Sequence, residues 1–340
     1  MKKIVTIGGG TGSFVLLSGL KKYPVRLSAI VSMADDGGST GILRDELGVL
    51  PPGDIRQCLV ALSDSSDKMR ELMNYRFENG GLKGHSFGNL LLSALEKING
   101  NFLKGVEDVS GLLNVKGEVI PVTDSDVNLY MELNNEKVLK GEHQINLDSE
   151  IEKRGIKKIY LKPKARANKK ALQRIKEANM IIIGPGNFYC SIIPNFLVNG
   201  IAKAVRDSKA IIVFNCNLVN KKGHTEKFTL DDYAGIINKY LGKERIDFIT
   251  FNSSRPAEKL VDKYQKHKEF LVPFKKELKR ERNYKIILTP LLRKEASKPN
   301  KVDVLANQRV FIRHDPDKLA KTLMLLLELE DNKNLIKAII

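Results

Sequence analysis

The sequence predicts an α/β protein with a Rossmann-like, doubly wound and mostly parallel sheet and a small antiparallel β insertion. Three transitions from an apolar run into a glycine-rich loop support this prediction. They join Lys2–Ile7 to Gly8–Gly12, Leu27–Met33 to Asp35–Gly38, and Met180–Ile183 to Gly184–Gly186. Because the carboxyl ends of parallel strands share one edge of a sheet, these loops are expected to meet where open α/β sheets bind ligands.

The first of these units resembles the opening of a dinucleotide-binding fold. After the loop at 8–13, apolar residues recur at helical spacing as far as Leu20, so the loop leads into a helix N-terminus that favours anions. Ser13 stands where the GxGxxG pattern has its third glycine, and Asp35 lies about where such folds place a ribose carboxylate. A nicotinamide or flavin dinucleotide is therefore one alternative ligand.

The stretch from Ala34 to Arg56 is rich in groups that bind ligands. Asp35 and Asp36 follow the second strand and precede two glycines and two hydroxyl side chains. Paired glycines let backbone N–H groups approach an anion, and paired carboxylates can hold a divalent cation or sugar hydroxyls. Asp35 and Asp36 are therefore candidates to hold a divalent cation, such as Mg²⁺, or sugar hydroxyls. After a short helix and a proline turn, Asp54 is predicted to cap the next helix.

Two later loops add polar residues to the predicted site. His85 lies on a glycine-rich loop before a helix that Ser86 is predicted to cap, and His85 and Asp54 are the candidates for a general base. Cys190 has no histidine nearby in the sequence and is predicted to be a packing residue. The loop at 184–195 offers uncharged groups suited to phosphate or sugar oxygens, namely Asn187, Tyr189, Ser191 and Asn195.

The chain is predicted to form one domain over residues 1–325. Val119–Ile145 alternates apolar and polar residues, which predicts antiparallel hairpins on the edge of the main sheet, an insertion at about 118–147. A basic segment at about 275–308 has no clear pattern. Asp315 is predicted to cap the last helix, at 317–329, and residues 326–340 are expected to form a C-terminal tail.

Charge and composition make nucleic-acid binding, membrane and secreted proteins less favoured classes for this chain. The formal net charge is +17, and the stretch from Lys263 to Lys301 holds 13 Lys or Arg against 4 Asp or Glu. With 6% aromatic residues and no Trp, this stretch is predicted to be a solvated face, and nucleic acid is the less favoured alternative partner. Three cysteines without a CxxC pair, no apolar run long enough for a membrane span and no signal-peptide pattern predict a cytoplasmic protein.

Seven motifs, in order along the chain, resemble the CofD-like superfamily. They are GGGTGS at 8–13, ADDGGSTG at 34–41, LPPGDIRQCLVAL at 50–62, YRF at 75–77, GHSFGNLLL at 84–92, GPGNFYCSIIPN at 184–195 and RHD at 313–315. The resemblance extends from residue 4 to about 325 and is strongest to the YvcK branch, the gluconeogenesis factors. It implies a Rossmann-like fold and a cytoplasmic protein that binds UDP-sugars, notably UDP-N-acetylglucosamine and UDP-glucose.

The resemblance implies different functions for the two branches. Proteins of the YvcK branch are needed for normal cell shape and wall synthesis on gluconeogenic carbon sources, and Tyr264 and Arg313 match positions that hold the UDP-sugar there. The CofD branch is a magnesium-dependent phospholactate transferase acting on a guanosine diphosphate-linked substrate, and its magnesium site is similar to the Asp35–Asp36 pair. This sequence departs from the family pattern at Cys190, where Thr is usual, and at 217–225.

The leading hypothesis is a sugar-nucleotide sensor that signals to an unidentified protein partner and requires no cofactor. The alternative is a magnesium-dependent transferase of the CofD type, and homo-oligomerisation is left open. The predicted ligand-binding residues are Gly9, Gly10, Thr11, Gly12, Asp36, Gly37, Gly38, Ser39, Arg56, His85, Asn89, Gly184, Gly186, Asn187, Tyr189, Ser191, Asn195, Asn217, Tyr264 and Arg313.

Overall fold

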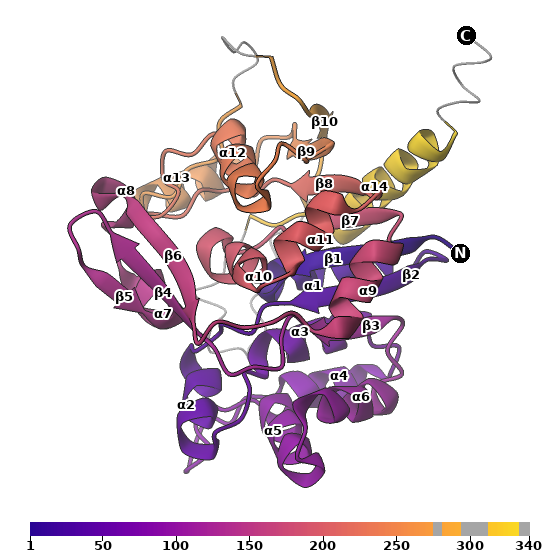
Figure 1. The fold of residues 1–340 in the computed structure, drawn as a ribbon, viewed down its shortest axis with the longest axis vertical. Coiled ribbons are helices and arrows are strands. Elements are labelled where there is room, and N and C mark those ends of the chain that lie inside the picture. Colours follow the sequence, from indigo (N-terminus) through magenta and orange to yellow (C-terminus); the bar gives the residue numbers. More distant parts are fainter. Residues whose placement is uncertain (275–280, 294–311, 333–340) are drawn as a thin grey trace.

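The main sheet of the computed structural model has seven strands in the order β10-β9-β8-β7-β1-β2-β3 (Figure 1). All its neighbouring strands are parallel. The structure describes residues 1–274, 281–293 and 312–332. The strands are β1 (Lys3–Gly8), β2 (Arg26–Val31), β3 (Glu118–Pro121), β7 (Met180–Ile183), β8 (Ile211–Asn215), β9 (Phe248–Asn252) and β10 (Lys285–Thr289). Six of them follow the Rossmann order, whose direction reverses between β1 and β7, so the predicted fold class is confirmed.

Helices cover both faces of this sheet. The helices α9, α10, α11 and α12 pack against one another in one layer, whereas α1 packs against α3 and α14 in the other (Figure 1). The helical segments are α1 (Gly10–Leu20), α2 (Gly38–Leu47), α3 (Gly53–Leu62), α4 (Asp67–Asn74), α5 (Phe87–Asn99), α6 (Phe102–Leu112), α7 (Gly141–Leu147), α8 (Ile151–Arg154), α9 (Lys169–Glu177), the π-helical turn η1 (Phe188–Ile192), α10 (Ile193–Leu197), α11 (Ile201–Asp207), α12 (Leu230–Leu241), α13 (Glu258–Lys266) and α14 (Pro316–Asp331).

Local sequence sets most of the helix starts. Ser86 Oγ accepts a hydrogen bond from the Asn89 amide at the start of α5, and Asp315 accepts from two amides at the start of α14, as predicted. The predicted cap at Asp54 is wrong, because α3 begins at Gly53 and places Asp54 inside its first turn. A carboxylate is favourable there as well, because it faces the positive end of the helix dipole. Its side chain is thereby directed toward the loop after β1.

The predicted β insertion at about 118–147 differs from the structure in its bounds and in the strands with which it pairs. Glu118–Pro121 is β3, an edge strand parallel to β2, whereas β4 (Asn128–Leu133), β5 (Val138–Lys140) and β6 (Ile156–Lys162) form a separate antiparallel sheet in the order β5-β4-β6. The antiparallel hairpins therefore do not extend the main sheet. Alternation along a strand indicates which of its faces is buried, but it does not identify the strand with which it pairs.

Two features of the C-terminal region differ from the expected domain bounds. The expected boundary at 325 lies inside α14, whose Leu326 and Leu327 are buried in the core. Within the basic segment, Lys285–Thr289 forms β10 and pairs with β9. Residues 275–280 and 294–308 of that segment, and 333–340 of the expected tail, lie outside the described residues.

Candidate functional site

A cavity of about 490 Å³ lies at the carboxyl edge of the main sheet, beside the switch point between β1 and β7. The loops after β1, β7 and β8 form its walls, and the segment before α14 closes one side. The predicted ligand residues that line it are Gly9, Gly10, Thr11, Gly12, Gly186, Asn187, Ser191, Asn217 and Arg313. Two of the three glycine loops therefore line this cavity, whereas Gly37 and Gly38 of the third loop are not among its lining residues.

The glycines of the loop after β1 let other groups approach its backbone, namely Pro185 in the loop after β7 and Asp54 on α3. A Cβ on Gly12 would stand 2.0 Å from the Pro185 carbonyl oxygen, and one on Gly9 would stand 2.1 Å from Asp54 Oδ2. Gly184 has a φ of 67°, a left-handed conformation that glycine adopts at little cost. The close approach leaves the first amides of α1 at the cavity wall, where a helix N-terminus attracts anions.

Asp54 and Glu142, which are distant in sequence, face this cavity, as does Glu269. Asp54 is only 9% exposed and accepts a hydrogen bond from the Gly10 amide. Burial, followed by the negative charge of Asp35, raises the pKa of Asp54 to about 8. Burial and the charges of Asp35 and Asp54 also raise the pKa of Glu142 well above its usual value. Both carboxyl groups therefore retain protons at a pH where exposed ones are charged.

The carboxylates of Asp35 and Asp36 accept hydrogen bonds from two different segments of the chain. Asp35 Oδ1 accepts a hydrogen bond from the Gly37 amide at 3.0 Å, whereas Asp36 Oδ1 accepts one from the His143 amide at 2.7 Å, in the first turn of α7. Neither is among the described residues that line the cavity, and Gly37 and Gly38 lie at the start of α2. Across the described ranges, no three His, Cys, Asp or Glu side chains gather in a group that could hold a metal ion.

Asn146 on α7 contacts two residues that line the cavity, Asn187 and Lys221, and the sequence analysis singled out neither Asn146 nor Lys221. Asn146 Oδ1 accepts hydrogen bonds from Asn187 Nδ2 at 2.7 Å and from Lys221 Nζ, and its amide donates to Glu142 at 3.1 Å. Lys221 lines the cavity, and burial lowers the pKa of its ammonium group. The only sequence signal is that Lys221 lies at 217–225, where the family pattern is broken.

Two buried polar atoms of the cavity wall lack a hydrogen-bond partner among the described residues. They are Nε2 of His314, which is 6% exposed, and Oδ1 of Asn217, whose Nδ2 donates to the Gly186 carbonyl at 3.0 Å. Burial lowers the pKa of His314 to about 4, so its ring is neutral at pH 7. An unsatisfied buried polar atom is costly, and a polar ligand in the cavity could satisfy both.

A second cavity, of about 770 Å³, shares Thr11, Gln57 and Arg313 with the first. The remaining walls come from α1, α3, α4 and the segment after α4, and they carry basic and aromatic side chains. The basic and aromatic ones are Phe14, Arg56, Lys68, Arg70, Tyr75 and Arg76, and Asp67, Glu71, Leu72 and Asn74 line the same cavity. Arg313 therefore lies where the two cavities meet, so that one guanidinium can reach a ligand that occupies both.

Four predicted ligand residues instead form a buried polar network. His85 Nδ1 lies 3.0 Å from Ser39 Oγ, which accepts from Asn89 Nδ2 at 3.2 Å, and Arg56 Nε donates to Asn89 Oδ1 at 2.9 Å. This network joins the start of α2 to α3 and α5. Arg56 also lines the second cavity. His85 is 7% exposed, and it is not among the described residues that line either cavity.

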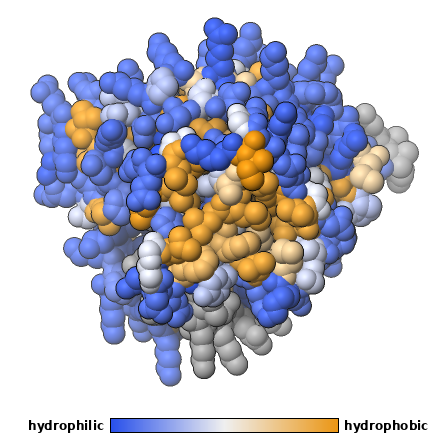
Figure 2. Space-filling view, turned by 90° about the horizontal axis from the view of Figure 1, so that it is seen from below, coloured by the Kyte–Doolittle hydropathy of each residue, from blue (hydrophilic) through white to orange (hydrophobic). Residues whose placement is uncertain are grey.

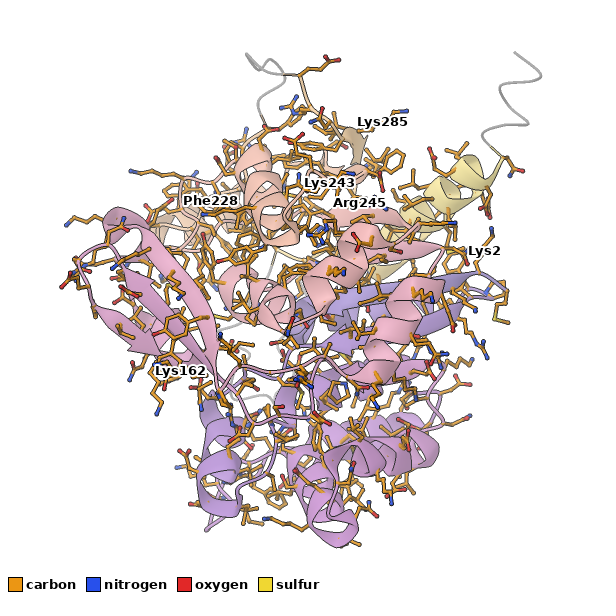
Figure 3. All side chains as sticks on the ribbon, in the orientation of Figure 1. Lys2, Lys162, Phe228, Lys243, Arg245 and Lys285 are labelled. Atoms are coloured by element: carbon orange, nitrogen blue, oxygen red, sulfur yellow. The ribbon has the colours of Figure 1, made fainter. Side chains whose placement is uncertain are left out.

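Three further predicted ligand residues point into the protein interior. Tyr189 packs edge-on against Phe188 and Phe228, with ring centroids 5.1 and 6.3 Å apart; Phe228 is labelled in Figure 3. Asn195 is fully buried and donates to the Ser191 carbonyl at 2.8 Å. The Tyr264 hydroxyl accepts from the Ile312 amide at 3.1 Å, so it positions the segment that carries Arg313.

These features define a class of protein, namely an α/β protein of Rossmann strand order with a two-part polar cavity between glycine loops. Its sequence and fold place it in a known family. The chain belongs to the CofD family, because the model described as 2-phospho-L-lactate transferase CofD matches residues 4–292. None of the helices in the described part of the chain has the length and apolar character needed to cross a bilayer.

Full-length relatives and solved structures agree with this assignment. A gluconeogenesis factor of Bacillus subtilis is 38% identical over 328 residues, which are 96% of this chain and 98% of that protein. A gluconeogenesis factor of Halalkalibacterium halodurans is 42% identical over 271 residues, 78% of this chain and 82% of that protein. A crystal structure of a Bacillus halodurans protein has a TM-score of 0.85 at 35% identity, covering 95% of this chain and 99% of that one. The resemblance to the gluconeogenesis-factor branch is confirmed.

Proposed function

We propose that this protein binds a UDP-sugar, UDP-N-acetylglucosamine or UDP-glucose, and acts as a cytoplasmic regulator of growth on gluconeogenic carbon sources, including cell shape and wall synthesis. The observation that carries this proposal is the pair of cavities that share Thr11, Gln57 and Arg313. A nucleotide sugar has two bulky ends joined by a diphosphate. Its shape therefore matches two cavities joined at an arginine.

The chemistry of the shared wall supports a diphosphate at the junction. The N-terminus of α1 presents backbone amides and a positive dipole end, and Arg313 adds a charged donor suited to phosphate oxygens. Asp54 would repel a diphosphate if it were charged. With a pKa of about 8 it is mostly protonated at pH 7 and can donate a hydrogen bond to a phosphate oxygen instead.

The polar groups on the far wall of the smaller cavity suit a sugar. Asn187, Asn217 and Ser191 are uncharged, and Asn217 Oδ1 and His314 Nε2 lack partners among the described residues. Uncharged donors and acceptors fit hydroxyl and N-acetyl groups, which lose hydrogen bonds to water when they bind. We therefore assign the sugar to the smaller cavity and the nucleoside to the larger one.

The way the cavity is joined to the small sheet supports the proposed regulatory role. Asp36 binds the first turn of α7, and Asn146 on that helix binds Asn187 of the cavity wall. A ligand that contacts Asn187 or Glu142 therefore also acts on α7 and the strands behind it. A partner protein that binds the occupied and empty forms with different affinity could detect the ligand.

The names of the relatives support the physiological part of the proposal. The Bacillus subtilis and Halalkalibacterium halodurans proteins are gluconeogenesis factors, and this chain matches most of the length of each. The proposed link is that a UDP-sugar reports the supply of wall precursors when sugars must be synthesised. A strain lacking the gene should lose normal shape on a gluconeogenic carbon source and regain it with the wild-type gene.

A thermal-shift panel tests the ligand directly. The purified chain is heated with UDP-N-acetylglucosamine, UDP-glucose, GDP, GTP or NAD, each with and without magnesium. A ligand at about 100 times its Kd stabilises the fold by about 2.7 kcal/mol. Stabilisation by UDP-sugars without magnesium is the expected result. Stabilisation by guanosine nucleotides or by NAD alone would contradict the proposal.

A second candidate function, magnesium-dependent transfer of a phosphorus-linked group, is favoured by Asp54 and Glu142, two of the three carboxyl side chains that line the smaller cavity. Magnesium needs only one or two carboxylates when substrate phosphates and water supply the other oxygens, and Asp54 and Glu142 are the residues that would hold it. Their raised pKa values fit such a site, because a divalent cation would relieve the repulsion between them. When bound, the ion would neutralise charge on the diphosphate.

The transferase candidate makes a distinct prediction. An acceptor hydroxyl would attack the phosphorus that carries the transferred group and release its proton to water, a new P–O bond would form, and the nucleoside monophosphate would leave as the P–O bond of the diphosphate breaks. Phosphorus-31 NMR with a guanosine diphosphate-linked substrate and candidate acceptors would detect the nucleoside monophosphate. Release that requires magnesium and disappears in Asp54→Asn would support this function. Tight UDP-sugar binding with no such release would support the regulator.

A further inference from the structure

The small antiparallel sheet has one buried face and one exposed face. The apolar side chains of the buried face belong to the hydrophobic core, namely Leu129, Met131, Leu133, Leu139, Ile159 and Leu161. The residues between them point to the other face. Figure 2 shows a mostly hydrophilic surface along its left side, the side on which Figure 1 draws this sheet.

The register of the three strands brings tyrosines and lysines together on the exposed face. Tyr130 of β4 lies opposite Tyr160 of β6 and Lys140 of β5. Glu132 lies opposite Lys158 of β6. The uncharged residues Asn128 and Val138 lie at the borders of this face. We define the tyrosine face by its central and charged residues, namely Tyr130, Glu132, Lys140, Lys158, Tyr160 and Lys162.

The two tyrosines hold two of the lysines in place. The rings of Tyr130 and Tyr160 are stacked, with centroids 5.5 Å apart and planes inclined by 8°. Lys158 Nζ lies 5.2 Å from the Tyr160 centroid. Lys162 Nζ, of the lysine labelled in Figure 3, lies 5.3 and 5.5 Å from the two centroids. Cation–π attraction acts at these distances, so both ammonium groups are held near the rings before a partner binds, which lowers the entropy lost on binding.

The unpaired charges of the tyrosine face are all positive. Lys140, Lys158 and Lys162 are exposed, and none of them pairs with a carboxylate of a residue that the structure describes. The carboxylate of the face, that of Glu132, pairs with Lys157 at 2.6 Å. A ligand of this face is therefore expected to carry negative charge.

Charges in the loops next to the strand ends do not offset this excess. Glu136 is exposed in the turn between β4 and β5. At the opposite end of the sheet Asp124 and Lys164 are exposed, whereas Asp126 pairs with Arg44 at 2.6 Å. The acidic residues therefore lie beyond the ends of the strands, and the middle of the face is basic.

The geometry of the face favours an extended acidic protein segment over a nucleic acid. Single-stranded nucleic acids bind basic surfaces by stacking bases on free aromatic rings. Here the rings of Tyr130 and Tyr160 stack on each other and lie beside ammonium groups, so little ring surface is left for a base. In an extended protein segment, side chains two residues apart point to the same side, about 7 Å apart. Alternate acidic side chains of one segment can therefore reach both lysines.

We propose that the tyrosine face binds an extended segment of a partner protein in which acidic side chains alternate along the chain. Carboxylates of the segment pair with Lys158 and Lys162, and its backbone lies across the tyrosines, a residue type enriched in protein interfaces. On the other side of the sheet, β4 and β5 pack against α7, whose Asn146 accepts a hydrogen bond from Asn187 of the cavity wall. The partner role rests on the proposed regulatory function, whereas binding of the segment itself needs no UDP-sugar.

Fluorescence anisotropy with a labelled peptide of alternating Glu and Thr tests this proposal. The full chain is titrated into the peptide in about 0.15 M salt, which screens attraction between charges more than about 8 Å apart. The wild type should bind this peptide. A matched peptide with Gln in place of Glu should bind more weakly by about tenfold or more. Equal affinity for the two peptides would overturn the proposal.

Two matched charge reversals locate the binding site on the chain. Lys158→Glu/Lys162→Glu reverses the lysines beside the rings, whereas Lys203→Glu/Lys239→Glu reverses two exposed lysines on α11 and α12. Both variants lower the net charge by the same amount. The first should lose affinity for the Glu peptide by about tenfold or more, and the second should bind it as the wild type does. Losses of equal size in both variants, or no loss in the first, would overturn the proposal.

Calorimetry with UDP-N-acetylglucosamine separates this proposal from the proposed function. Lys158→Glu/Lys162→Glu should bind this UDP-sugar as the wild type does, because neither lysine is among the described residues that line the two cavities. Unchanged binding also shows that the variant is folded. If no chain binds the UDP-sugar while the peptide results hold, the proposed function is wrong and the docking surface is still supported.

Other anionic ligands provide the remaining control. An oligothymidine and vesicles containing phosphatidylglycerol are titrated with the same variants. The expected result is that neither ligand distinguishes Lys158→Glu/Lys162→Glu from Lys203→Glu/Lys239→Glu. If either ligand binds the wild type more tightly than the Glu peptide does, and only the first variant loses that binding, the face serves a nucleic acid or a membrane and the proposal is overturned.

Discussion

Two pairs of acidic residues near the sheet edge have different roles. Asp35 and Asp36 are adjacent in sequence, yet their carboxylates accept hydrogen bonds from different segments, the start of α2 and the first turn of α7. Asp54 and Glu142 are far apart in sequence, yet both face the cavity, and the charge of Asp54 helps to raise the pKa of Glu142. The adjacent pair holds the loops in place, whereas the distant pair faces the cavity.

The difference between the two pairs shows that residues adjacent in a motif need not contact the same ligand. Consecutive residues after a strand project in different directions, so an Asp-Asp pair rarely presents two carboxylates to one ligand unless the loop turns back. Convergent side chains come more readily from separate elements, here α3 and α7. The following predictions test this comparison, starting with the largest expected effect.

Asp54→Asn should change how stability depends on pH. Because the folded pKa of about 8 exceeds the ordinary 3.8, the unfolded chain releases this proton at lower pH than the folded chain does. The wild type therefore has the full stabilisation below about pH 4 and loses it as the pH rises toward about 8. Relative to the wild type, the variant should gain about 2–4 kcal/mol between about pH 5 and pH 8.5 in urea titrations. Asp45→Asn, at an exposed site, should leave the profile unchanged.

Gly12→Ala should disrupt the contact between the two glycine loops. The added Cβ would lie 2.0 Å from the Pro185 carbonyl oxygen, so the loops must separate. We expect a loss of about 1–3 kcal/mol in the free energy of unfolding, measured by chemical denaturation. Gly111→Ala is the matched control, because no atom lies within 4 Å of its added Cβ in α6. The control should be neutral or stabilised by up to about 1 kcal/mol.

Arg313→Ala should weaken binding of UDP-N-acetylglucosamine without unfolding the chain. A hydrogen bond to a charged group contributes about 1.5–3 kcal/mol, so the affinity measured by titration calorimetry should fall about 10- to 100-fold. Arg26→Ala is the control, because Arg26 is exposed at the opposite edge of the sheet, where β2 begins. An unchanged affinity in Arg313→Ala would remove this residue from the proposed site.

Asp36→Ala should act as the loss of a helix cap. The carboxylate accepts from the His143 amide, so its removal should cost about 1 kcal/mol of stability. The loss should be the same with and without magnesium in thermal melts. A stabilisation by magnesium that is present in the wild type and absent in Asp36→Ala would restore Asp36 as a metal ligand. Asp124→Ala, an exposed carboxylate, serves as the control.

Tyr189→Phe should have the smallest effect. Its ring packs against Phe188 and Phe228 in the interior, and removal of the hydroxyl preserves that packing. UDP-sugar affinity should change by less than about twofold, an effect within about 0.5 kcal/mol. Asn187→Ala, two residues earlier on the cavity wall, should weaken binding severalfold. Equal losses in the two variants would indicate that the aromatic ring contacts the ligand.

Part of the candidate site could be predicted because it consists of glycines, which are needed where the backbone turns sharply after a strand. Gly9, Gly12 and Gly186 follow apolar strands, and the strand-to-loop pattern indicates the edge where they meet. Glu142, Asn146 and Lys221 could not be found in this way. They lie on a short helix and a loop with no motif of their own, and only the packing of α7 against the loop after β7 brings them to the cavity.

The sequence by itself determined the fold class, the capped helix starts at Ser86 and Asp315, and the positions of the glycine loops, because each depends on residues close together in the chain. The tertiary structure alone decided that β6 pairs with β4, that Tyr189 points inward and that Asp54 and Glu142 share a cavity. Burial and long-range contacts set these features, and neither is encoded in local spacing.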